Sequence, residues 1–133
     1  MAFFSADTGR LLFSDGLLLE KGMPGQQLNE RYSPLREEEA LCLDAHPAKG
    51  GSLALVCALR LGCLCGVTLH VQAVGGKEGV GADRQRAFLF RALGLRDPCP
   101  DTRRTVRVAC AFGHLLIYSD PYTGSAAARI QYE

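Results

Sequence analysis

The sequence predicts an α+β domain, a single curved antiparallel β-sheet of about seven short strands with two helices packed on it. Three observations lead to this prediction. Apolar residues alternate with small or polar ones over most of the chain, and a period of two is typical of half-buried strands. The connections between these runs are short and rich in glycine, proline and aspartate, as in hairpins. Only two stretches have the composition or spacing of a helix.

The chain begins with two expected turns and short strands. Apolar runs at residues 3–7 and 11–14 flank the segment Asp7-Thr8-Gly9, and this arrangement predicts a tight hairpin. Asp15-Gly16 predicts a second turn, and a short strand is expected at residues 17–19. We therefore expect the N-terminal segment to contribute β-structure rather than a helix.

The first helix is expected at residues 26–31. Pro24 suits the first position of a helix, because its fixed φ is already helical and its missing N–H is not needed there. Ser33-Pro34 would end the helix, because the residue before a proline avoids the α conformation. The expected buried side consists of Met23, Leu28 and Tyr32.

The clearest strand pattern lies in the middle of the chain. After a strand at residues 39–44 and a loop at 46–51, residues 53–61 alternate large apolar side chains with small or polar ones. Gly62 permits a turn, and the alternation resumes in the next run. Its expected core-facing set is Cys63, Cys65, Val67, Leu69 and Val71. The two runs together predict a long antiparallel hairpin with one face in the core.

A glycine-rich connector and the second helix follow. Residues 75–81 contain four glycines but lack the Gly-Lys-Ser/Thr ending of a phosphate-binding loop, so a plain connector is expected. Asp83 is a suitable N-cap for a helix at residues 84–93, and Gly94 a suitable residue after its C-terminus. The spacing places Phe88, Leu89, Ala92 and Leu93 on one side and Arg84, Arg86 and Arg91 mostly away from it.

The last part of the chain predicts more strands. Residues 106–112 alternate, Gly113 interrupts the run as at a bulge or bend, and residues 115–118 continue it. Residues 120–124 have turn composition. A half-buried strand is expected at residues 126–133.

Composition and charge exclude several classes of protein. The chain has 133 residues, of which 47% are hydrophobic, and that is too apolar for a disordered protein. The length suits one domain, expected to span residues 1–133. A formal net charge of +1 gives no basic excess for nucleic acid or an anionic membrane, so neither is expected as a partner. The apolar stretch at residues 52–74 is interrupted by polar residues and is not expected to span a membrane.

The six cysteines are expected to be reduced. The N-terminus lacks the pattern of a secretory signal, so we expect a cytoplasmic protein without a disulfide framework. Cys42, Cys57, Cys65 and Cys110 have apolar neighbours and are interpreted as core thiols. Cys63 and Cys65 lack two further ligands for zinc, and no residue pairs recognisably with Cys99 for catalysis, so neither a metal nor a cofactor is expected.

Two groups of polar and aromatic residues are candidates for contact with a protein partner. A run of glutamates is usually a solvated face, but it also presents negative charge that speeds association with a basic partner. Tyrosines and polar residues around the last turn fit turn chemistry, or a binding edge that offers rigid contact area. The candidate contact residues are Glu37, Glu38, Glu39, His114, Tyr118, Asp120 and Tyr122.

Three pieces of the chain together resemble a known type of protein. They are residues 4–23, which contain Gly9, Gly16 and Gly22, the turn and strand at residues 62–69, and the closing segment at residues 118–124 with its following strand. Their order resembles small uncharacterised proteobacterial proteins that look like the immunity partners of polymorphic or secreted antibacterial toxins. The resemblance implies no catalytic residue. This chain is richer in cysteine than that pattern and lacks tryptophan.

The resemblance implies a cytoplasmic, non-enzymatic inhibitor that binds a cognate toxin domain and occludes its active site. Charged side chains would steer the encounter of the two proteins. Two alternatives remain open at this point. One is a small enzyme or ligand-binding domain with its site near residues 75–81 or Cys99. The other is a structural subunit that forms a homodimer through an exposed sheet edge.

Overall fold

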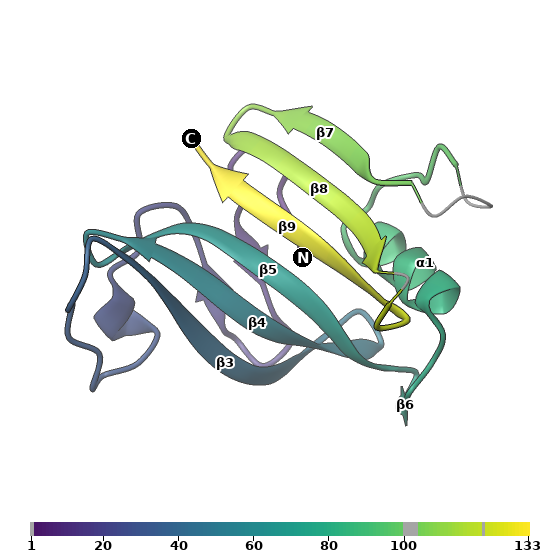
Figure 1. Ribbon diagram of the computed structural model, residues 1–133, viewed down its shortest axis with the longest axis horizontal. Coiled ribbons are helices and arrows are strands. Elements are labelled where there is room, and N and C mark those ends of the chain that lie inside the picture. The colour runs from purple at the N-terminus through teal and green to yellow at the C-terminus, as the bar shows by residue number, and fades with distance from the viewer. Residues whose placement is uncertain (1, 100–103, 121) are drawn as a thin grey trace.

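A computed structural model describes residues 2–99, 104–120 and 122–133 of the chain. These residues form a seven-stranded antiparallel sheet in the order β3-β4-β5-β9-β8-β7, with β6 pairing β5, and a two-stranded sheet of β1 and β2 (Figure 1). The strands are β1 (Leu11–Leu12), β2 (Leu18–Leu19), β3 (Glu38–Ala48), β4 (Gly51–Arg60), β5 (Cys63–Val74), β6 (Lys77–Glu78), β7 (Val106–Cys110), β8 (Gly113–Asp120) and β9 (Ser125–Tyr132). The predicted antiparallel sheet is confirmed, but the described residues contain one α-helix, α1 (Ala82–Ala92), instead of two.

The predicted first helix is wrong. The chain makes only a short 3₁₀ turn, η1 (Gly25–Gln27), in which the Leu28 N–H donates to the Gly25 carbonyl. Glycine has a low helix propensity, and no side chain caps the start of this turn. A Cβ at Gly25 would lie 2.5 Å from the ring of Tyr32, so the glycine here serves the close approach of that ring.

The hydrophobic core lies between one face of the large sheet and two covering elements. Figure 1 shows the N-terminal segment and α1 behind the sheet. Phe4 packs edge-on against Phe112, whose ring lies 5.7 Å from that of Tyr132. The Tyr132 hydroxyl donates to the Gly9 carbonyl at 2.8 Å. Because φ of Gly9 is +74° and a Cβ there would lie 2.5 Å from the Tyr132 ring, only glycine suits this contact.

Helix α1 starts at a different residue than the sequence predicts. Its four predicted core residues, Phe88, Leu89, Ala92 and Leu93, are buried, and it also buries Gln85, Arg86 and Phe90. Its N-cap is Gly81. Asp83 lies in the first turn, where its negative charge interacts favourably with the helix dipole. Gln85 is buried although it is polar. Its amide nitrogen donates to the Val80 carbonyl at 2.8 Å, and its carbonyl oxygen accepts the Ala126 N–H at 2.9 Å. Gln85 therefore joins α1 to the start of β9.

The prediction that Arg86 points away from the core is also wrong. Its side chain is 3% exposed and forms an ion pair with Asp97, with Nε 2.7 Å from one carboxylate oxygen and Nη2 3.2 Å from the other. Nη1 donates to the Arg104 carbonyl. Burial of this charge is tolerated because the guanidinium is paired, and the pair ties the segment after α1 to the helix.

Two local features change the predicted strands. Gly113 does not interrupt one strand. It begins β8, which forms a hairpin with β7 in which Cys110 pairs with Gly113. A register shift between β4 and β5 at Leu59 places Leu64 in the core, where Cys63 and Cys65 are predicted. A bulge reverses the facing of the residues beyond it, and a period of two does not reveal it.

No helix among the described residues is long and apolar enough to span a membrane. Helix α1 is the longest of them at 11 residues, and Gln85, Arg86 and Phe88 all contribute to its buried side. Its apolar side is used against β5, β8 and β9. The helix is therefore explained by the core that it covers.

Candidate partner-binding face

The large sheet has one face that no described helix or strand covers. In Figure 1 this face points toward the viewer, with the N-terminal segment and α1 on the other side. We call it the open face. Pairing register and alternation assign to it Ala40, Cys42, Ala54, Val56, Ala58, Gly66, Thr68, His70, Ala127, Arg129, Gln131, His114, Leu116, Tyr118, Arg107 and Ala109.

Register arranges these side chains in rows that cross the sheet. One row is small at the β3 side and polar at the β8 side, and it runs Ala40, Ala58, Gly66, Gln131, His114. The next row runs Cys42, Val56, Thr68, Arg129, Leu116, Arg107. Small side chains thus dominate the β3–β5 half of the face. Arginine, histidine, leucine and tyrosine enter the β9–β7 half.

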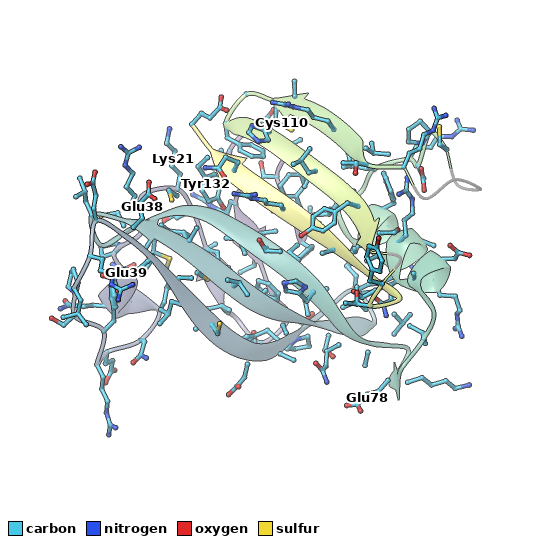
Figure 2. The ribbon with its side chains drawn as sticks, in the orientation of Figure 1. Lys21, Glu38, Glu39, Glu78, Cys110 and Tyr132 are labelled. Carbon is cyan, nitrogen blue, oxygen red and sulfur yellow. The ribbon has the colours of Figure 1, made fainter. Side chains whose placement is uncertain are left out.

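A hollow of about 530 Å³ opens at one end of the open face. Its lining residues are Arg36, Glu38, Glu39, Ala40, Ala58, Leu59, Arg60, Cys65, Arg129, Gln131 and Tyr132. Three of them are arginines, and we call it the arginine hollow. Figure 2 shows Glu38 and Glu39 at this end of the sheet and Glu78 at the opposite end.

The carboxylate of Glu39 is already bound within the chain. Its Oε1 accepts the backbone N–H groups of Leu35 and Arg36, each at 2.7 Å. These two hydrogen bonds are the main reason that the pKa of Glu39 is below its usual value of 4.5. Glu39 therefore fixes the turn before β3, and its charge is not free for a partner in the way that the glutamate run suggests.

The other glutamates of this run are exposed. Glu37 forms a loose ion pair with Arg60 at 3.9 Å, and both side chains are more than 60% exposed. Glu38 pairs in register with Arg60 on the open face. Exposed pairs of this kind contribute little to stability, so both groups can rearrange on binding.

The structure separates the predicted contact residues into two groups. His114 lies in the same row as Ala40, so it shares an end of the sheet with Glu37, Glu38 and Glu39. β3 and β8 are nevertheless four strand positions apart, or about 19 Å. The imidazole Nδ1 of His114 lies 3.0 Å from a carboxylate oxygen of Glu133.

The rest of the predicted group lies toward the other end. Tyr118 is half-buried on the open face and pairs with Ala127. Tyr122 is 97% exposed in the turn before β9. Asp120 ends β8, and its side chain lies outside what the structure describes. No single contact patch therefore contains all seven candidates.

The arginines of the hollow are the residues that sequence reasoning missed. Arg36 precedes β3, Arg60 ends β4 and Arg129 lies within β9. Alternation indicates that Arg129 points away from the core. It does not indicate that β9 pairs with β5, and this pairing brings the three arginines to one hollow.

The prediction of four core thiols is confirmed for Cys57 and in part for Cys110, which packs against the core, but it is wrong for Cys42. Cys57 is buried, and burial raises the pKa of its thiol to about 11. Cys42 is exposed on the open face, and Cys65 and Cys110 are half-buried. In strands, apolar sequence neighbours point to the opposite face, so they do not report on the burial of the cysteine itself. Within the described residues, no three His, Cys, Asp or Glu side chains gather in a way that could hold a metal ion.

The two sites of the enzymatic alternative lie away from the hollows found here. In the described parts of the chain, three hollows of about 530, 300 and 170 Å³ have no lining residue from segment 75–81 and do not include Cys99.

Comparison of the chain with protein-family models, curated proteins and solved structures found no match.

Proposed function

We propose that this chain is a non-enzymatic protein-binding inhibitor, an immunity protein that occludes the active site of a cognate secreted antibacterial toxin. One observation carries the binding part of the proposal: a broad sheet face that no described helix or strand covers. The sequence resemblance carries the toxin part. Residues 4–23, 62–69 and 118–124 remain the segments on which that resemblance stands.

The dimensions of the open face favour a protein over a small ligand. From β3 to β7 the face spans five strand spacings, about 24 Å. A small-molecule site encloses most of its ligand's surface. The arginine hollow is bordered by exposed Arg36, Arg60 and Arg129, which do not enclose a ligand but do offer contacts to a second surface.

The chemistry of the open face also suits a protein partner. Arginine and tyrosine are enriched where proteins bind one another, and Arg129 and Tyr118 both lie on this face. Small residues such as Ala58 and Gly66 project little from the β3–β5 half of the face, so a partner's side chains can approach the sheet backbone closely. A rigid sheet needs little reordering when it binds, and low ordering cost favours tight inhibition.

Growth competition tests this proposal. The gene for the chain is deleted from the bacterium that encodes it. This deletion strain is then mixed with its parent on a solid surface. We expect the deletion strain to lose viability beside a secretion-competent parent and to recover when the chain is restored. Equal survival beside that parent would contradict the proposal, and so would a loss that persists beside a parent unable to secrete toxins.

A further inference from the structure

Small residues lie in the arginine hollow and beside it. Ala40 and Ala58 line the hollow, and Gly66 on β5 is the next residue in their row. A Cβ at Gly66 would lie 3.0 Å from the Ile130 carbonyl oxygen, so a larger residue there would press on β9. Small side chains on neighbouring strands therefore leave the hollow open.

The wall of the hollow carries more positive charge than its own carboxylates neutralise. Among the described residues, no carboxylate oxygen lies within 4.0 Å of the Arg129 or Arg36 guanidinium. Arg60 has only its 3.9 Å contact with Glu37. Glu38 and Glu39 line the same wall, so three arginines stand against two carboxylates there. Glu39 is held by two backbone N–H groups and also interacts with the charge of Arg36. Guanidinium groups bind carboxylates in a two-pronged geometry, and these three come from separate segments.

Two large exposed apolar side chains flank the arginines of the hollow in sequence, and one of them, Leu61, lines the neighbouring hollow of about 170 Å³. Leu35 is 86% exposed and Leu61 is 72% exposed, and each is adjacent in sequence to an arginine of the wall. Leu61 and Gly62 form the two-residue turn between β4 and β5, and both have positive φ, as such a hairpin turn requires. Arginine is enriched at protein interfaces, and exposed leucines beside it offer apolar contact that the phosphates of a nucleic acid would not use.

We infer that the arginine hollow binds the carboxylates of an acidic segment on the partner protein, with Leu35 and Leu61 packing against apolar residues beside that segment. The inference rests on the proposed function, because it names the chemistry of the partner's surface. The inference also predicts that the bound part of the partner is negatively charged. The glutamate run predicts a basic partner, whereas the hollow, with three arginines and two glutamates in its lining, favours an acidic segment.

Titration of the ¹⁵N-labelled full chain with a hexaglutamate peptide at low salt tests the inference. We expect the side-chain N–H signals of Arg129, Arg60 and Gln131 to shift with a common affinity. In Arg129→Glu this affinity should fall at least tenfold. The matched control is Arg84→Glu, which makes the same charge change on α1 behind the sheet, and it should bind within twofold of the unmodified chain.

Three results would overturn the inference. They are no shift at the arginine signals, an equal loss of affinity in Arg129→Glu and Arg84→Glu, and a DNA duplex that shifts the same signals at lower concentration than the peptide. Failure here is distinct from failure of the proposed function. A chain with Arg129→Glu that still protects the deletion strain contradicts only the inference, whereas peptide binding without any protection contradicts only the immunity function.

Discussion

The two faces of the seven-stranded sheet come from the same strands and differ in almost every physical respect. On β4 the covered face carries Leu53, Leu55, Cys57 and Leu59, and all four are at most 2% exposed. The open face of the same strand carries Ala54, Val56, Ala58 and Arg60. One face is filled by α1 and the N-terminal segment (Figure 1). Small residues on a sheet can therefore mark an accessible surface as readily as a tightly packed one.

Substitutions at adjacent positions of β4 give the largest expected difference between the faces. Leu55→Ala removes a side chain that is 1% exposed, and the lost burial and the cavity should reduce the free energy of unfolding by about 2–5 kcal/mol. Val56→Ala, on the open face, should reduce it by less than about 1 kcal/mol. Urea denaturation of both variants checks this, and equal losses would show that the open face is packed as well.

The buried ion pair behind the sheet should give the next largest effect. Arg86→Ala leaves Asp97 and the Arg104 carbonyl without their partner, and we expect a loss of about 3 kcal/mol in the free energy of unfolding. Arg84→Ala, at an exposed position of the same helix, is the control and should change it by less than about 0.5 kcal/mol. Similar losses in the two variants would mean that the pair does not hold the segment after α1.

The same pair predicts a dependence on pH. The guanidinium of Arg86 is the main reason that the pKa of Asp97 is below its usual value of 3.8. Because the folded state binds the proton less readily than the unfolded state, the contribution of Asp97 is present above pH 3.8 and is lost as the pH falls through the lowered pKa. Asp97→Asn should flatten this part of the stability profile, and an unchanged acid slope in that variant would contradict the assignment.

A smaller effect is expected at the hydroxyl of Tyr132. Tyr132→Phe keeps the ring against Phe112 but removes the donor to the Gly9 carbonyl, which is then buried without that partner. The expected loss in the free energy of unfolding is about 1–2 kcal/mol. Thermal unfolding measures it. No change would mean that the Gly9 carbonyl finds another donor.

The cysteines of the two faces should differ in the rate at which they react with a thiol reagent. Cys42 and Cys63 are exposed and should react at once with Ellman's reagent in the folded chain. Cys57 is buried with a pKa of about 11 and should react only after denaturant is added. Replacing Cys57 with serine should remove part of the slow phase alone. Immediate reaction of Cys57 would contradict the covered core of β4.

The sequence predicts the part of this fold that depends on local periodicity. Alternation along residues 53–59 identifies the covered face of β4, and the spacing of Phe88 and Leu89 identifies the helix. It fails at Cys63 and Cys65, because a register shift changes which residues face the core. It fails at Arg86, because the burial of a charge depends on a carboxylate that comes after the helix.

The candidate site is less predictable than the fold for a related reason. Glu37, Glu38 and Glu39 stand out in the sequence because they are consecutive, yet Glu39 serves a local turn. Arg60 and Arg129 do not stand out in the sequence. They line the same hollow only because β5 pairs with β9. The alternation with a period of two does not reveal which strands far apart in the sequence pair with each other.

We propose that the open face, and not the side with α1 and the N-terminal segment, binds the partner. The most direct test restores the deletion strain with either of two variants of the chain. Thr68→Arg places a large charge in the middle of the open face, and Gln26→Arg places one at an exposed position of η1. With melting temperatures unchanged in both, we predict that Thr68→Arg fails to protect and that Gln26→Arg protects fully. Full protection by Thr68→Arg would contradict binding through the open face.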